Sequence, residues 1–233
     1  MSSDDTRGDR SSKGGSWRFQ ALIAIFIGCL IAANLIAVKL IVVFGMVLPA
    51  AIVIFPVSYI VGDVLTEVYG YAQARRVIWL GFIANLAVVA AIAAGQALPA
   101  APFWQGQSAY EQILGQTPRI LMASFAAYLA GEFTNSYVLA RLKVATGGRH
   151  LWLRTIGSTA IGQGIDSLIF ITAAFALVLP GDMLAGAILA QWLAKTAYEA
   201  AATPLTYAVV GYLKRAEGID VFDRDTRFSP FAL

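Results

Sequence analysis

Residues 58–76 read SYIVGDVLTEVYGYAQARR, within a chain whose other long segments are almost entirely apolar. Asp63 and Glu67 lie one helical turn apart in this stretch, and Arg75 and Arg76 end it. In a soluble protein the same pattern is an ordinary helix end. In a bilayer a central charge costs about 3 kcal/mol even on the gentlest insertion scale. Two carboxylates there need a cation, a cavity or a ligand.

The composition places the chain in a membrane. Of its 233 residues, 58% are hydrophobic and only 13% are charged, against about a quarter charged in a soluble domain. The mean hydropathy is +0.69. The net charge of +3 is too small to indicate a nucleic-acid partner.

Few residues are available for metal or nucleotide chemistry. The single cysteine, Cys29, excludes a disulfide framework and a cysteine-based metal site, and the single histidine, His150, excludes a histidine-rich one. The chain contains no GxxxxGK[ST] motif, so it does not hydrolyse ATP by that route. We therefore expect no metal and no cofactor.

Six apolar segments are long enough to cross about 30 Å of hydrocarbon at about 1.5 Å per helical residue. They predict an all-α, polytopic membrane domain over residues 18–215 with six transmembrane helices. A disordered tail (1–17), rich in Ser, Gly, Asp and Arg, precedes the domain, and a polar tail (216–233) follows it. The expected spans are 19–44, 49–70, 76–98, 118–142, 152–179 and 183–213, with 45–48 as the first loop.

The positive residues predict the orientation of these spans. All but three of the 17 Lys and Arg residues lie in the two tails, in the second connection or around the fourth. Cytoplasmic loops carry the excess of Lys and Arg in membrane proteins, so we expect both termini in the cytoplasm. The 99–117 loop, which contains Phe103, Trp104 and Tyr110, then lies at the outer surface.

Four charged residues fall near the middle of the expected spans: Asp63, Glu132, Asp166 and Lys195. Three acids and one base cannot all neutralise one another, so at least one carboxylate is expected to be protonated, solvated or matched by a ligand. Small-substrate transporters place their site at this level of the bilayer. Further polar residues lie near this level or toward the membrane edges: Asn34, Lys39, Asn135, Gln163 and Glu199.

Each of these residues also has a structural interpretation. Glu67 can form an interfacial ion pair with Arg75 or Arg76, Lys39 can extend to the outer surface, and the amides can join helices through hydrogen bonds. Asp63 and Asp166 are formal candidates for an intramembrane aspartate pair. Neither lies in the YD or GxGD context of such proteases, and no histidine at membrane depth is present to activate a serine.

Four blocks resemble the queuosine-precursor transporter family, also called the VUT family of vitamin-uptake-like membrane proteins. They are GDVLTEVYGYAQARRVIWLGF (62–82), GEFTNSYVLARLK (131–143), RTIGSTAIGQGIDSLIF (154–170) and VFDRDTRFSPF (221–231). The resemblance implies a transporter rather than an enzyme. It further implies import of 7-deazaguanine precursors of the tRNA nucleoside queuosine (preQ0, preQ1 or queuine) across the bacterial inner membrane, without an ATPase module.

The resemblance also implies a set of substrate-binding residues. Carried onto this chain, they are Asn34, Lys39, Asp63, Glu67, Tyr69, Glu132, Asn135, Gln163, Asp166, Lys195 and Glu199. A 7-deazaguanine presents adjacent N–H donors, which one carboxylate can accept in a bidentate arrangement. We expect Glu132 or Asp166 to make that contact.

The expected mechanism is alternating access around a midplane polar site, and two alternatives remain. One is the substrate-binding subunit of an energy-coupling-factor-type vitamin transporter, because residues 28–32 (GCLIA) form a small-xxx-small stretch that can dock another helix. The other is an intramembrane enzyme. The expected partners are the small-molecule 7-deazaguanine and the lipid bilayer, with no nucleic acid, and a homodimer is a further hypothesis.

Overall fold

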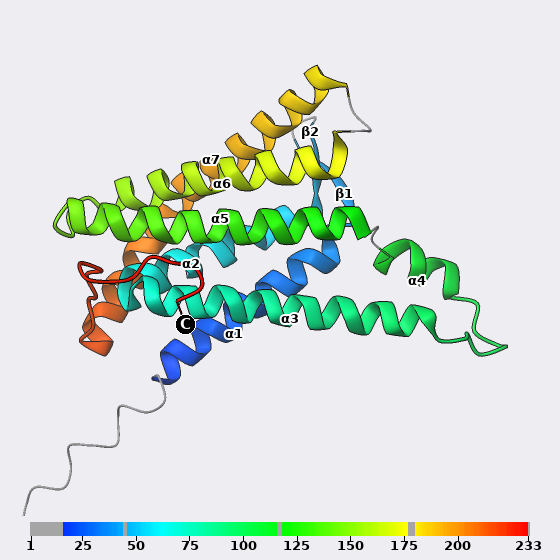
Figure 1. Ribbon diagram of the computed structural model, residues 1–233, viewed down its shortest axis with the longest axis horizontal. Helices are drawn as coiled ribbons and strands as arrows, with labels where there is room; N and C mark the ends of the chain where they lie inside the picture. The colour runs from blue at the N-terminus through cyan, green and yellow to red at the C-terminus, as the bar shows by residue number, and fades with distance from the viewer. Residues whose placement is uncertain (1–15, 44–45, 116–117, 177–179, 233) are drawn as a thin grey trace, which may run out of the picture.

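A computed structural model describes residues 16–43, 46–115, 118–176 and 180–232, and in this part the chain is mostly helical. Figure 1 shows the long helices running roughly along one another. The α-helices are α1 (Trp17–Ile36), α2 (Phe55–Tyr69), α3 (Tyr71–Ala97), α4 (Gln107–Leu114), α5 (Pro118–Ala145), α6 (Leu151–Phe175) and α7 (Gly181–Glu217). Each of the six expected segments contains one of them. Apart from residues 16 and 17, the expected disordered tail lies outside the described residues.

The helix that carries Asp63 and Glu67 is the centre of the bundle. Thirteen of the 15 residues of α2 are buried, and α2 contacts α1, α3, α5 and α7. At about 1.5 Å per residue it is about 22 Å long, which is shorter than the hydrocarbon core of a bilayer. Its polar residues therefore face other helices, not lipid.

The expected boundaries of the first two spans are wrong. The α1 helix ends at Ile36, and the chain then forms an antiparallel hairpin of β1 (Leu40–Val43) and β2 (Met46–Pro49), in which Leu40 pairs with Pro49. A short 3-10 helix (Ala50–Val53) leads into α2. Branched residues of β1 favour an extended backbone, and Pro56 lies at the start of α2, where a helix tolerates proline. Hydropathy alone does not separate a strand from a helix in such a run.

Within the described residues, three helices are long and apolar enough to cross a membrane: α1, α3 and α6. The chain is thus a multi-pass membrane protein. The α5 and α7 helices are longer than α1, but they carry charged and amide side chains that are buried inside the bundle, such as Glu132, Asn135 and Glu199. Inward-facing polar residues lower the hydropathy of a span without exposing charge to lipid.

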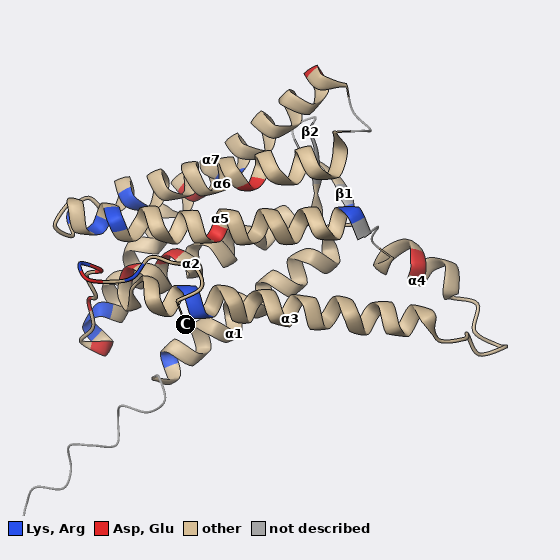
Figure 2. Ribbon diagram, in the orientation of Figure 1, with Lys and Arg blue, Asp and Glu red and all other residues tan. Residues whose placement is uncertain are grey.

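Most of the charged residues gather at one end of the bundle, where α5 and α7 end and α6 begins (Figure 2). The hairpin and α4 lie at the opposite end (Figure 1). The positive-inside rule predicts that the charged end is the cytoplasmic one. We use "inner end" and "outer end" in this sense, and the orientation itself stays a prediction.

A close crossing of α5 and α6 holds two site residues together. A methyl group added to Gly131 would lie 2.8 Å from Cβ of Asp166, and one added to Gly162 would lie 2.8 Å from Cβ of Asn135. Small residues at a helix crossing allow the two backbones to approach. The crossing therefore brings the α6 acid and the α5 amide toward the same level of the bundle.

The C-terminal segment (218–232) packs against the inner end of the bundle. Asp223 Oδ2 accepts a 2.9 Å hydrogen bond from the backbone N–H of Tyr71, at the start of α3. Arg75 donates to the backbone carbonyls of Arg227 and Ser229, each at 2.9 Å. Gly70, between α2 and α3, has a φ of +84° and lies against this segment. The polar tail expected from the sequence is thus attached to the turn between α2 and α3.

Candidate functional site

Asp63 lies on α2 and is fully buried. Its Oδ1 accepts a 2.7 Å hydrogen bond from Nδ2 of Asn135 on α5. Its Oδ2 has no hydrogen-bond partner among the described residues. The charges of Glu199, Glu132 and Glu67 are close enough to act on Asp63. The central acid therefore has one neutral partner and, on other helices, two acidic neighbours.

Glu132 on α5 and Glu199 on α7 are the acidic neighbours, and both are buried. Oε2 of Glu132 faces α2, because it would lie 3.4 Å from a methyl group added to Gly62. Oε1 of Glu199 has no hydrogen-bond partner in the described ranges. Among the ion pairs of the described residues, none involves Asp63, Glu132 or Glu199.

Amide oxygens add to this group of carboxylates. Oδ1 of Asn135 and Oε1 of Gln163, on α6, are buried without a hydrogen-bond partner in the part of the chain that the structure describes. A buried polar atom without a partner costs about 1–3 kcal/mol, so native structures contain few of them. We call Asp63, Glu132, Asn135, Gln163 and Glu199 the central acceptor cluster, because its unmatched atoms are all hydrogen-bond acceptors.

The other two charges expected at mid-membrane, Asp166 on α6 and Lys195 on α7, form an ion pair with each other. Nζ of Lys195 also lies over two rings of α2, 5.7 Å from the centroid of Phe55 and 5.8 Å from that of Tyr59. The two rings are nearly parallel, with centroids 6.0 Å apart. Asp166 thus already forms an ion pair, whereas Glu132 forms none within the described residues.

Glu67, one turn after Asp63, joins three cations at the inner end. Its Oε1 lies 2.8 Å from Nη2 of Arg154, 2.7 Å from Nζ of Lys214 and 3.7 Å from Nζ of Lys143. Both Lys143 and Lys214 also pair with Asp220 of the C-terminal segment. We call these five residues the inner ion cluster.

The alternative interpretation of Glu67, an ion pair with Arg75 or Arg76, is not what the described residues form, and the guanidinium of Arg75 turns to the C-terminal segment. The cations that meet Glu67 come instead from α5, α6 and α7. They are 76 to 147 residues away from it along the chain. The block resemblance contains Lys143 and Arg154, and it is the only signal that could have singled them out.

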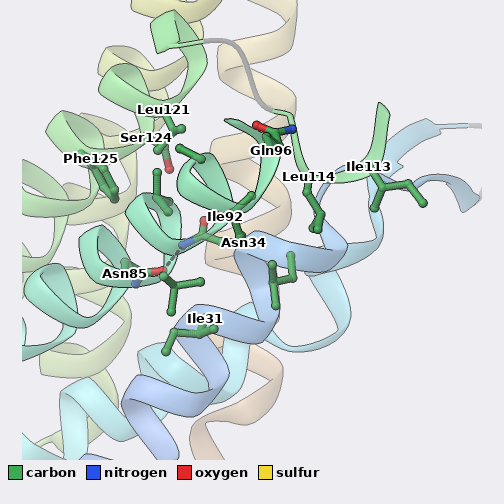
Figure 3. Close-up of a pocket in the computed structure, with 14 residues that line it drawn as sticks. Ile31, Asn34, Asn85, Ile92, Gln96, Ile113, Leu114, Leu121, Ser124 and Phe125 are labelled. Carbon is green, nitrogen blue, oxygen red and sulfur yellow. Dashed lines mark hydrogen bonds between the residues drawn. The ribbon is translucent and has the colours of Figure 1, made fainter. Parts of the chain in front are cut away.

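Three further predicted residues lie away from the central acceptor cluster. Nδ2 of Asn34 donates a 2.8 Å hydrogen bond to Oδ1 of Asn85 in a cavity near the outer end (Figure 3). Lys39 is exposed in the turn that follows α1. The ring of Tyr69 packs 4.7 Å from that of Phe19, between α1 and α2. Their roles in binding stay predictions.

The cluster is suited to a ligand that donates several hydrogen bonds. Carboxylate and amide oxygens accept N–H groups, and carboxylates accept two at once from an edge with adjacent donors. Within the described ranges, no group of three or more His, Cys, Asp or Glu side chains is arranged to hold a metal ion.

Comparisons with known proteins place the chain among membrane transporters. The family model described as "Putative vitamin uptake transporter" matches residues 49–209. A Bacillus subtilis (strain 168) protein named "Probable queuosine precursor transporter" is 32% identical over 179 residues, which cover 76% of this chain and 78% of that protein. The "Queuosine precursor transporter" of Escherichia coli (strain K12) is 31% identical over 121 residues, 52% of each chain. No solved structure matches the chain significantly.

Proposed function

The chain belongs to the queuosine-precursor transporter family, and from that premise we propose that it imports 7-deazaguanine precursors of queuosine across the bacterial inner membrane. The candidate cargoes are preQ0, preQ1 and queuine. One observation carries the proposal: a central cluster of buried acceptors contains oxygens without a hydrogen-bond partner, and its carboxylates form no ion pair within the described residues. A ligand rich in N–H donors supplies the missing partners.

Glu132 is the carboxylate that we assign to the bidentate contact. The sequence left Glu132 and Asp166 as alternatives, and Asp166 is engaged by Lys195. Oε2 of Glu132 faces α2 beside Asp63. Asp63 accepts from the amide of Asn135, and Gln163 follows Gly162, which packs against Asn135. Those amides can accept the remaining N–H groups or donate to the ring carbonyl.

The inner ion cluster is suited to closing the substrate path at the inner end of the protein. The inner ion cluster joins α2, α5, α6 and α7 with the C-terminal segment. In this proposal, these ion pairs keep the inner end of the bundle closed in this conformation. Alternating access requires that such contacts break and re-form while the substrate site stays in place. Glu67 thus serves as a gate residue in this proposal, rather than as a direct ligand.

Uptake measured side by side with preQ0, preQ1, queuine and guanine tests the proposal. The purified chain alone in proteoliposomes should accumulate or equilibrate at least one 7-deazaguanine with saturable kinetics, and the cargo should be recovered chemically unchanged. Uptake that strictly requires added ATPase subunits would favour the energy-coupling-factor alternative. Recovery of a modified cargo would favour an intramembrane enzyme. Absence of saturable binding for all four compounds would refute the proposed cargo class.

A further inference from the structure

A cavity near the outer end of the bundle is shown with its lining side chains in Figure 3. Its inner space is about 80 Å³, it is partly open to the surface, and it is lined by α1, α3, α4 and α5. We call it the outer cavity. Ile113 and Leu114 of α4 form one of its walls, and Phe125 of α5 contributes an aromatic ring.

The outer cavity is apolar except for four uncharged polar side chains: Asn34, Asn85, Gln96 and Ser124. The buried side chain of Asn85 accepts from Asn34 at 2.8 Å and donates to the carbonyl of Gly81 at 3.2 Å. No Asp, Glu, Lys or Arg is among the described residues that line the cavity. A charged ligand would lose its hydration here without a counter-charge, whereas a neutral ring would lose little.

The side chain of Phe26 lies close to a glycine beside the outer cavity and to a glycine beside the central acceptor cluster. Gly81 lies one helical turn from Asn85 on α3. A methyl group added to Gly81 would lie 2.8 Å from Oη of Tyr128 and 3.1 Å from both Phe26 and Leu30. Phe26 also lies 3.6 Å from the position of a methyl group on Gly62, which is the glycine that faces Glu132.

We propose that the outer cavity is a second substrate site, which takes the uncharged form of the same flat nitrogen heterocycle before it passes Phe26, Leu30 and Tyr128. This inference rests on the proposed function. Amides can match both the donors and the acceptors of such a ring, and Phe125 and the aliphatic walls can cover its faces. Among the precursors, preQ0 is uncharged and preQ1 carries an ammonium group, so the outer cavity favours preQ0.

Filling the cavity with a larger side chain tests the proposal. Ala93 lines the outer cavity, whereas its neighbour Ala94 is also exposed but does not line it. Ala93→Trp and Ala94→Trp are therefore a matched pair of variants. Equilibrium binding of radiolabelled preQ0 to purified protein should give two sites per wild-type chain, one site for Ala93→Trp and two for Ala94→Trp.

Transport gives a second readout. With external preQ0, Ala93→Trp should raise the half-saturating concentration about tenfold, whereas Ala94→Trp should leave it unchanged. Gln96→Leu, which keeps the shape of the cavity wall but removes an amide, should act in the same direction. Glu132→Gln should abolish the other binding site and keep the outer one, which shows that the two sites are distinct.

The results separate this inference from the proposed function. One preQ0 site per wild-type chain, with Ala93→Trp binding and transporting like Ala94→Trp, would overturn the outer site and leave the proposed function standing. Phospholipid that co-purifies with wild type and is lost in Ala93→Trp, with preQ0 binding unaltered, would do the same. Failure of every variant and of wild type to bind any 7-deazaguanine would refute both.

Discussion

At the scale of single residues, two buried glutamates behave oppositely, because only one of them forms ion pairs. Glu132 forms none among the described residues, whereas Glu67 accepts from Arg154 and Lys214. Removing the charge of Glu132 relieves an uncompensated burial, while removing that of Glu67 leaves buried cations without their partner. The first substitution should therefore affect transport and the second stability.

Glu132→Gln should lower precursor uptake about 10- to 100-fold, because hydrogen bonds to a charged acceptor contribute about 1.5–3 kcal/mol. The protein should remain folded, with an unfolding temperature no lower than that of wild type. Glu111→Gln is the matched control, because Glu111 lies exposed on α4, and it should transport normally. Unchanged uptake by Glu132→Gln would contradict the assignment of the bidentate contact.

Glu67→Gln should lower the free energy of unfolding by about 3–5 kcal/mol, the usual cost of breaking a buried ion pair from one side. Asp220→Asn removes a carboxylate of the same cluster whose side chain is 44% exposed, so its effect should be much smaller. Thermal unfolding in detergent measures both. An unfolding temperature equal to that of wild type for Glu67→Gln would show that the inner ion cluster does not hold the bundle.

At the scale of elements, the C-terminal segment stabilises the start of α3 through Asp223. Asp223→Ala should cost about 0.5–2 kcal/mol, as the loss of a helix cap does, and should make the segment more sensitive to trypsin at Arg224 and Arg227. Asp225 is the control, because it is exposed and only two residues away. Equal cleavage of wild type and Asp223→Ala would contradict this role.

The attachment of the same segment should also depend on pH. Burial alone would raise the pKa of Asp220, but hydrogen bonds from Lys143 and Lys214 outweigh it and lower the pKa below its ordinary value. A lowered pKa in the folded state stabilises the attachment above the ordinary carboxyl pKa of about 4, and this contribution is lost as the pH falls through the folded pKa. The protection of residues 218–232 from hydrogen exchange, measured relative to the intrinsic exchange rate at each pH, should therefore fall below about pH 4, and less steeply in Asp220→Asn.

At the scale of the whole molecule, the separation of charge predicts the orientation in the membrane. In a Cys29→Ala background, a cysteine at position 108 on exposed α4 should react with an impermeant maleimide added outside intact cells. A cysteine at position 224 in the C-terminal segment should react only after the membrane is opened. The reverse pattern would contradict the predicted cytoplasmic location of the C-terminus.

Local patterns of the sequence predicted the helical character of each segment, but not every boundary. The β-hairpin at 40–49 was missed because an apolar run of branched residues satisfies the hydropathy of a span as well as that of a strand. The membrane location followed from composition. The buried acids, such as Asp63 and Glu132, could be identified from the sequence because a charged residue is rare in an apolar segment. The sequence did not show which of these acids forms an ion pair, since that depends on residues that the fold brings together from distant spans.

By itself the amino-acid sequence determined that this chain enters a membrane, that it does so through helices, and that charged groups lie inside them. Those properties depend on side-chain hydration and on neighbours within a few residues. The tertiary structure alone decided that Asp166 pairs with Lys195, that Glu67 joins cations of α5, α6 and α7, and that Glu132 forms no ion pair within the described residues. The reason is physical: Coulomb attraction acts over a few ångströms of space, and helix packing sets which charges come that close.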